Sequence, residues 1–97
     1  MTKVIAAILT KNEARHIAEC IKSVQWADAI ILEDSFSNDG TVEIAQAMGV
    51  KIFQSKFVNF AIARDNALKN ARDLGAEWIF FIDADERVTP ELAEEIQ

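Results

Sequence analysis

The stretch WIFFIDADE, residues 78–86, decides the fold of this 97-residue chain. Its first part is an unbroken run of aromatic and β-branched residues, which is typical of a strand buried on both faces of a parallel sheet. Asp83 and Asp85 follow this run at once. Two carboxylates directly after a buried strand indicate either a turn or a metal site, and the remainder of the chain bears on the choice.

Three other apolar runs have the same character and alternate with segments of helical periodicity. Such alternation predicts βαβ units, a parallel sheet and right-handed crossovers that place helices on both faces. The predicted fold is α/β, a Rossmann-like three-layer α/β/α arrangement around about four strands, in one domain spanning residues 1–97. The three other runs are Val4–Leu9, Ala29–Leu32 and Val50–Phe53, and the helical segments are 12–25, 41–48, 60–74 and one opening at Thr89 and Pro90.

Composition narrows the class of partner. The apolar fraction of 51% and charged fraction of 27% are those of ordinary globular proteins. The net charge of −6 argues against a nucleic-acid partner, which calls for a basic surface. No apolar run reaches the roughly 20 residues that span a bilayer. The one cysteine, Cys20, can form no internal disulfide, which fits a reducing compartment.

Polar chemistry gathers just after the apolar runs, where ligands bind in parallel sheets. If the chain stays extended through Asp83-Ala84-Asp85, alternate side chains share one face, and the two carboxylates point into one pocket about 6.8 Å apart along the strand. Hard oxygen ligands of this kind suit Mg²⁺ or Mn²⁺, which often bridge to substrate phosphates. We therefore expect a metal site at Asp83 and Asp85.

Three other polar positions each have two interpretations. Thr10 and Glu13 have the spacing of a capping box that starts a helix, and the same groups could bind the polar atoms of a nucleotide. Asp34 ends a strand, where its carboxylate can accept hydrogen bonds from a base or ribose. Arg64 is either a surface residue, alone or paired with an acid, or a group that faces an anionic ligand.

Several other residues are expected to be structural. His16 is predicted to lie on a helix surface, and Cys20, on an apolar helix face, is predicted to lie in the core. Trp26 and Trp78 flank apolar runs and are predicted to be packing residues. Residues 37–40 are predicted to form a turn and to cap the helix that follows.

Four segments, in order, resemble the inverting family 2 glycosyltransferases of the GT-A fold, and most closely the bacterial members that build lipopolysaccharide core sugars. They are LTKNE, AIILEDSFSNDGTVEIA, RDNALKNA and WIFFIDADE, and together they cover nearly the whole chain. The resemblance implies the nucleotide-binding N-terminal half of a GT-A domain, with strand order 3-2-1-4. It also implies transfer of a sugar from a nucleotide-diphospho-sugar, a UDP-sugar foremost, to a glycan or lipid-linked acceptor.

The same resemblance implies a role in lipopolysaccharide or other cell-envelope glycan biosynthesis. It places the protein in the cytoplasm, at the inner face of the bacterial cytoplasmic membrane, with a peripheral association of the full-length protein. By resemblance, Thr10, Asn12 and Glu13 line the nucleotide pocket, Asp34 binds the base or ribose, and Arg64 contacts the base or a phosphate.

For the D-x-D pair, the resemblance implies that Asp83 contacts the ribose or metal and that Asp85 is the principal ligand of Mg²⁺ or Mn²⁺. The chain departs from the family pattern at residues 34–37, where many relatives read D-D-G-S and this chain reads DSFS. The family's general base is an acid well beyond the D-x-D, so both the base and the acceptor half are expected beyond Gln97.

Two alternatives of other classes remain open. A haloacid-dehalogenase-like phosphatase also carries a D-x-D after a strand, but Arg87 stands where its D-x-D-x-T motif needs threonine. A non-catalytic nucleotide-binding or regulatory module of flavodoxin-like shape would share the fold without the chemistry. An open reading frame that continues past Gln97 would favour the transferase over this module.

Overall fold

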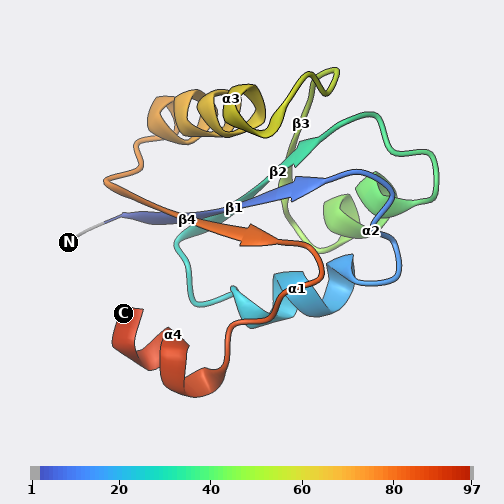
Figure 1. The fold of residues 1–97 in the computed structure, drawn as a ribbon. Coiled ribbons are helices and arrows are strands. Elements are labelled where there is room, and N and C mark those ends of the chain that lie inside the picture. Colours follow the sequence, from blue (N-terminus) through green and yellow to red (C-terminus); the bar gives the residue numbers. More distant parts are fainter. Residues whose placement is uncertain (1–2, 97) are drawn as a thin grey trace.

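A computed structural model describes residues 3–96 and shows a four-stranded parallel sheet between two layers of helices (Figure 1). Strands and helices alternate along the chain, as the apolar runs predict. The elements are β1 (Val4–Thr10), α1 (Ile17–Ser23), β2 (Ala29–Asp34), α2 (Thr41–Ala47), β3 (Lys51–Gln54), α3 (Phe60–Asp73), β4 (Trp78–Asp83) and α4 (Pro90–Ile96).

The strand order is β3-β2-β1-β4, which confirms the order 3-2-1-4 that the resemblance implies. The register brings the carboxyl ends of neighbouring strands together. Thr10 at the end of β1 lies opposite Asp34 at the end of β2, and Leu9 lies opposite Asp83 at the end of β4. The chain order reverses at β1, so the polar residues after β1 and β4 lie beside the position where such sheets bind ligands.

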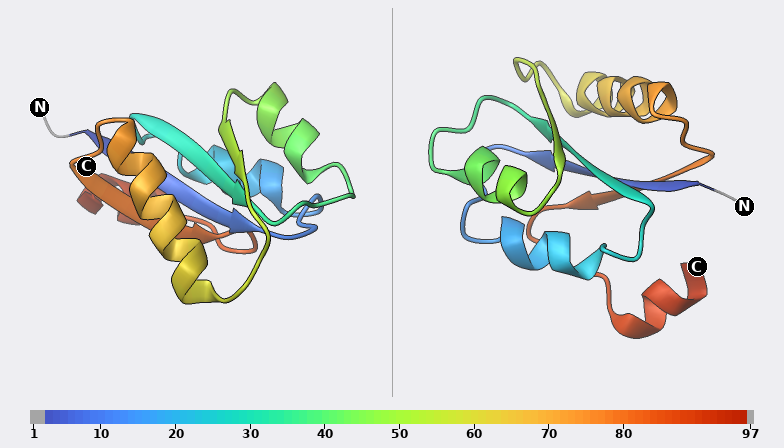
Figure 2. Two further views of the ribbon diagram at one scale, coloured as in Figure 1. Left: turned by 90° about the horizontal axis from the view of Figure 1, so that it is seen from above. Right: turned by 180° about the vertical axis from the view of Figure 1, so that it is seen from behind.

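Each face of the sheet has its own apolar core. Figure 2 shows α3 over one face and α1, α2 and α4 over the other. The α3 core is small and includes Ala67 and Ala71, whose short side chains let the helix lie close to Ile5 and Ile31. On the other face Cys20 is fully buried among aliphatic residues of the larger core, which confirms its predicted position. None of the helices within residues 3–96 is both long and apolar enough to cross a bilayer.

The first helix is shorter than predicted, because residues 11–16 form a loop joined to the loop after β2. Asn12 has a φ of 55°, in the left-handed region that is incompatible with a right-handed helix, and α1 begins only at Ile17. Side chains of residues 37–41 accept hydrogen bonds from the backbone of this loop. The N–H groups of Asn12, Glu13 and Ala14 donate to Ser37 Oγ, Thr41 Oγ1 and Asp39 Oδ2 at 2.7, 2.9 and 3.1 Å.

The structure therefore excludes the capping-box interpretation of Thr10 and Glu13. Thr10 is the last residue of β1, and its hydroxyl donates to Asp34 Oδ1 at 2.6 Å instead of accepting from a helix N–H. The predicted side-chain cap of α2 is not formed at the N-cap position, because that residue is Gly40 and no side chain there caps the helix. Asp39, one residue earlier, accepts from the N–H of Thr41 through Oδ1 at 3.1 Å.

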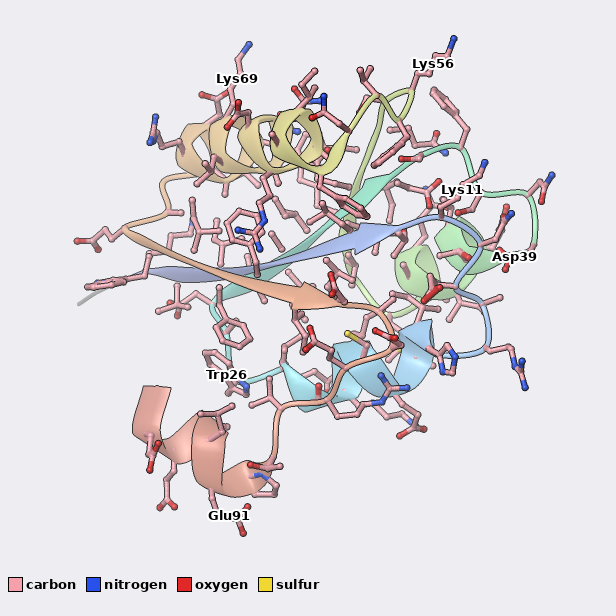
Figure 3. The ribbon with its side chains drawn as sticks, viewed as in Figure 1. Lys11, Trp26, Asp39, Lys56, Lys69 and Glu91 are labelled. Atoms are coloured by element: carbon pink, nitrogen blue, oxygen red, sulfur yellow. The ribbon has the colours of Figure 1, made fainter. Side chains whose placement is uncertain are left out.

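The two tryptophans differ. Trp26 packs edge-on against Phe80, with ring centroids 5.6 Å apart, as predicted, and Figure 3 shows it beneath the sheet. Trp78 was also predicted to pack, but this is wrong, because 68% of its surface is exposed. It opens β4, the outermost strand of the sheet beside β1, where less of the chain is available to cover a large ring. His16 is partly buried at the start of α1 and makes no capping hydrogen bond with its side chain.

Candidate functional site

A cavity of about 730 Å³ opens at the carboxyl ends of the strands. It spans the sheet, because its walls come from the ends of β1, β2 and β4 and from the segment that leads into α3. Four of the predicted site residues, Thr10, Glu13, Asp83 and Asp85, line it together. The others that line it are Leu9, Lys11, Glu33, Ser35, Phe36, Lys56, Phe57, Phe60, Ala63 and Ala84.

The D-x-D pair is placed by a turn and not by an extended strand. β4 ends at Asp83, and the N–H of Glu86 donates to the carbonyl of Asp83 at 2.9 Å, so Asp85 lies within the turn. The prediction of an extended Asp83-Ala84-Asp85 segment is therefore wrong. Both carboxyl side chains are nevertheless exposed on the cavity wall, while Ala84 between them is buried in the core.

Two neighbours hold this turn in shape. The side chain of Glu86 accepts from the N–H of Asp83 at 2.9 Å, which closes the turn from its other end. The guanidinium of Arg87 donates to the carbonyls of Ala84 and Glu86 at 2.9 and 2.6 Å. The positions of the two aspartates are thus fixed by backbone contacts that do not use their carboxylates.

The carboxylates of Asp83 and Asp85 fit an open Mg²⁺ or Mn²⁺ site. Within residues 3–96 neither side chain accepts a hydrogen bond or forms an ion pair, so their oxygens are free to bind a cation. In the same part of the chain no third acidic, histidine or cysteine side chain completes a cluster with them. Mg²⁺ is commonly held by one or two carboxylates plus water and substrate phosphates, so two carboxylates on a cavity wall could hold it.

Asp34 has a different environment from the one predicted. It is buried, does not line the cavity, and accepts four hydrogen bonds within the chain. Burial raises its pKa, but the hydrogen bonds outweigh burial, so the pKa of Asp34 lies below its ordinary value. The donors are Thr10 Oγ1 (2.6 Å), Ser37 Oγ (2.6 Å), Ser37 N (2.8 Å) and Gln54 Nε2 (3.2 Å).

A carboxylate offers about four acceptor positions, and those of Asp34 are occupied. Contact of Asp34 with a base or ribose stays a prediction. The hydrogen bonds of Asp34 hold the side chain of Thr10 and the loop that carries Ser37 in place. Thr10, in turn, lines the cavity.

Asn12 and Lys11 hold the loop after β2. The Asn12 side-chain oxygen accepts from the N–H of Asn38 at 2.9 Å, and Asn12 does not line the cavity. Sequence reasoning missed Lys11. Its ammonium group donates to the carbonyls of Ser35 and Phe36 at 2.9 and 3.0 Å while its side chain lines the cavity. Figure 3 shows Lys11 at the end of the molecule where Lys56 also lies.

Arg64 lines a second, smaller cavity of about 400 Å³. Leu9, Phe60 and Asp83 border both cavities, so the two adjoin. The guanidinium of Arg64 lies 5.0 Å from the ring centre of Phe81, within the range of a cation–π contact. Arg64 is thus close to the D-x-D turn, and its predicted contact with a base or phosphate stays a prediction.

Sequence reasoning also missed Glu33 and three phenylalanines. Glu33 lines the cavity and accepts from the side chain of Asn70. Burial raises its pKa, and the hydrogen bond from Asn70 offsets this only in part. Phe36, Phe57 and Phe60 lie in or beside polar, turn-rich segments, and that setting was the signal that could have revealed them.

Comparison with known proteins identifies the family of this chain. The family described as Glycosyl transferase family 2 matches residues 6–97. An uncharacterized glycosyltransferase of Rickettsia felis (strain ATCC VR-1525 / URRWXCal2) is 39% identical over 98 residues, covering 100% of this chain and 34% of the relative. The SPbeta prophage-derived glycosyltransferase SunS of Bacillus subtilis (strain 168) is 37% identical over 86 residues, covering 84% of this chain and 20% of the relative.

The lipopolysaccharide core biosynthesis glycosyltransferase LpsC of Rhizobium meliloti (strain 1021) is 30% identical over 94 residues, covering 92% of this chain and 34% of the relative. The chain spans about a third of the length of the first curated relatives it matches. The family match takes in all four strands except the first residues of β1, and with them every residue of the site described above. The chain therefore belongs to glycosyl transferase family 2.

Proposed function

We propose that this chain is the donor-binding part of a glycosyltransferase that transfers a sugar from a nucleotide-diphospho-sugar, foremost a UDP-sugar, to a glycan or lipid-linked acceptor. The observation that carries the proposal is the single cavity onto which Thr10, Glu13, Asp83 and Asp85 converge from β1 and β4. Family membership supports a nucleotide-sugar donor in general terms. The relationship to LpsC, by its name a lipopolysaccharide core enzyme, supports lipopolysaccharide or other envelope glycans as the product.

In this proposal Asp83 and Asp85 would hold Mg²⁺ or Mn²⁺ at the cavity wall. When bound, the cation supplies charge that offsets the negative charge developing on the leaving diphosphate. The turn fixed by Glu86 and Arg87 holds the two carboxylates in place before the donor arrives, which lowers the cost of ordering them. Thr10 and Glu13 line the same cavity, where they can contact the polar groups of the donor.

We assign the general base of the proposed reaction to none of the residues that the structure describes. An acidic general base would take the proton of the acceptor hydroxyl, and the oxygen would attack the anomeric carbon opposite the diphosphate, with inversion. The proposed setting is the cytoplasm, beside the membrane that carries a lipid-linked acceptor. A free, buried Cys20 agrees with a reducing compartment.

The proposal is tested by binding to the 97-residue chain. Amide chemical shifts would be followed while UDP is added in the presence of Mg²⁺, and line broadening would be followed with trace Mn²⁺. We expect shifts and broadening centred on Asp83–Glu86. The variants Asp83→Asn and Asp85→Asn should weaken Mn²⁺ broadening at least about tenfold, since each removes an anionic ligand.

A matched control is Asp73→Asn, which neutralises an exposed carboxylate at the end of α3, away from both cavities. It should leave the shifts caused by UDP and the broadening caused by Mn²⁺ unchanged. Absence of any change near Asp83 and Asp85 at millimolar UDP and Mg²⁺ would contradict a donor site in this chain. The phosphatase alternative predicts turnover of an aryl phosphate instead, and the family match gives that alternative no support.

A further inference from the structure

We infer that Phe36, Phe57 and Phe60 form the base subsite of the cavity and stack on the nucleobase of the donor. This inference rests on the proposed function, because it takes a nucleoside diphosphate as the ligand. It assigns base binding to three residues that lie outside the predicted site residues, in place of Asp34.

The three rings are unusually exposed for phenylalanine. Phe36, Phe57 and Phe60 leave 55%, 47% and 71% of their surfaces exposed, and all three line the same cavity. A clustered apolar surface at the mouth of a cavity is a common mark of a ligand site, whereas single exposed apolar residues are ordinary. Phe57 and Phe60 also contact each other edge to face, with centroids 5.2 Å apart, so they form one aromatic wall.

Phe36 is held in place at a conformational cost. Its φ of 54° lies in the left-handed region that a bulky residue seldom adopts. Contacts on both sides enforce it, because Lys11 donates to the carbonyl of Phe36 and Asp34 binds the next residue, Ser37, through two hydrogen bonds. Strained residues that their surroundings hold in place are concentrated at binding and active sites.

The strand order fixes which end of a nucleotide meets these rings. Asp83 ends β4 and Asp85 follows it at one side of the sheet, while Phe36 follows β2 and Phe57 follows β3 at the other. Phe60, the first residue of α3, borders both cavities with Asp83 and extends the aromatic wall toward the β4 side. Two spacings between strands, about 10 Å, separate β4 from β2 across β1. A diphosphate held at the β4 side therefore directs the ribose across β1, past Thr10, and the base toward the aromatic side. Figure 1 shows the loops that follow β4, β1 and β2 at the same end of the sheet.

Stacking is the interaction that these rings can offer, because every nucleobase has an aromatic face and phenylalanine has no hydrogen-bonding group. Asp34 then acts as a positioning residue. Its carboxylate is filled by internal hydrogen bonds, and it determines the path of the loop that carries Phe36.

The experiment compares two probes on the 97-residue chain, UDP with Mg²⁺ and inorganic pyrophosphate with Mg²⁺. The second probe has the phosphates but no base. In the UDP complex, the uracil H5 and H6 protons should shift upfield and show nuclear Overhauser contacts to phenylalanine ring protons. The variants Phe36→Leu, Phe57→Leu and Phe60→Leu keep an apolar side chain and remove the ring, so they isolate stacking from apolar burial.

Each leucine variant should lower the affinity for UDP about tenfold and leave the affinity for pyrophosphate unchanged. The control Trp78→Leu removes an exposed aromatic ring that lines neither cavity, and it should change neither affinity. Amide spectra of each variant verify that the fold is kept.

The outcomes separate this inference from the proposed function. Unchanged UDP affinity in all three leucine variants, or no contact between uracil and phenylalanine protons, overturns the base subsite. Binding of pyrophosphate without binding of UDP also overturns it, while the metal part of the proposed function stands. If neither probe binds, both proposals fall.

Discussion

Thr10 and Asp34 face each other at the carboxyl ends of β1 and β2, and the hydroxyl of Thr10 donates to the Asp34 carboxylate at 2.6 Å. Thr10 lines the larger cavity, whereas Asp34 is buried and does not line it. The pair therefore links the wall of the site to the interior of the sheet. Its removal should affect stability as well as binding.

Replacing Thr10 with valine keeps the shape of the side chain and deletes the donor. We expect Thr10→Val to lower the free energy of unfolding by about 1.5–3 kcal/mol, because a hydrogen bond to a buried charge is lost. Urea unfolding at pH 7 measures it. Thr10→Ser, which keeps the hydroxyl, should recover most of the loss, and equal stability of Thr10→Val and the parent chain would contradict the role of this bond.

The Asp34 carboxylate should make the chain sensitive to acid. Its pKa lies below the ordinary value in the folded state, so its contribution to stability is fully present above the unfolded-state pKa of about 4 and is lost as the pH falls through the folded-state value. Asp34→Asn should therefore be much less stable than the parent chain at pH 7, and the gap should narrow below about pH 4. Urea unfolding across this range measures the gap. A gap that stays constant down to pH 2 would show that the charge of Asp34 is unimportant.

Glu33, the neighbour of Asp34, should show the opposite dependence. Burial raises its pKa in the folded state, so the stability linked to Glu33 is present below the unfolded-state pKa and is lost as the pH rises through the folded-state value. Glu33→Gln keeps an acceptor for Asn70 and removes the buried charge, so it should stabilise the chain at pH 7.

The gain should disappear below about pH 4, where the glutamate is already protonated in both states. Denaturant curves at pH 7 and pH 3.5 compare the two conditions. Glu94→Gln, on the exposed face of α4, serves as the control and should stay within about 0.5 kcal/mol of the parent chain. A loss of stability in Glu33→Gln at pH 7 would contradict the prediction.

Cys20 should be nearly inert in the folded chain. Burial raises the pKa of its thiol from 9.0 to about 11 and outweighs the nearby guanidinium of Arg87. Because the thiolate is the reactive form, the rise alone slows reaction about 100-fold at pH 8. Ellman's reagent should thus modify the folded chain at least about 100 times more slowly than the chain in urea. Rates within a factor of ten would indicate that α1 opens readily.

The sheet and most helices follow from local patterns in the sequence. The apolar runs locate β1 to β4 to within a residue or two, and the bounds of α2 and α3 agree with helical periodicity and with Gly49 and Gly75, which follow those helices at φ values of 84° and 89°. Strand order came from resemblance to the family, because the spacing of the runs alone does not order parallel strands.

What the sequence did not reveal depends on contacts between loops that are distant along the chain. Asp34 receives a hydrogen bond from Gln54, which opens a segment with no distinctive motif, and no local pattern indicates that its carboxylate is already saturated. The late start of α1 arises in the same way, since Ser37 and Asp39 bind the backbone of residues 12–14. The turn at Asp85 needed the contact between Glu86 and Asp83, which an alternating strand pattern does not contain.

The reciprocal hydrogen bonds between residues 11–14 and 35–41 have a consequence for how this region tolerates insertions. Side chains and backbone of each loop bind the other, so a lengthened loop on either side would break several bonds at once. Within the described part of the chain, no backbone group of residues 56–58 is hydrogen-bonded, and these residues are exposed. Extra residues inserted there would leave the sheet intact. The length of the segment that carries Phe57 could therefore vary while the strand ends that line the cavity stay in place.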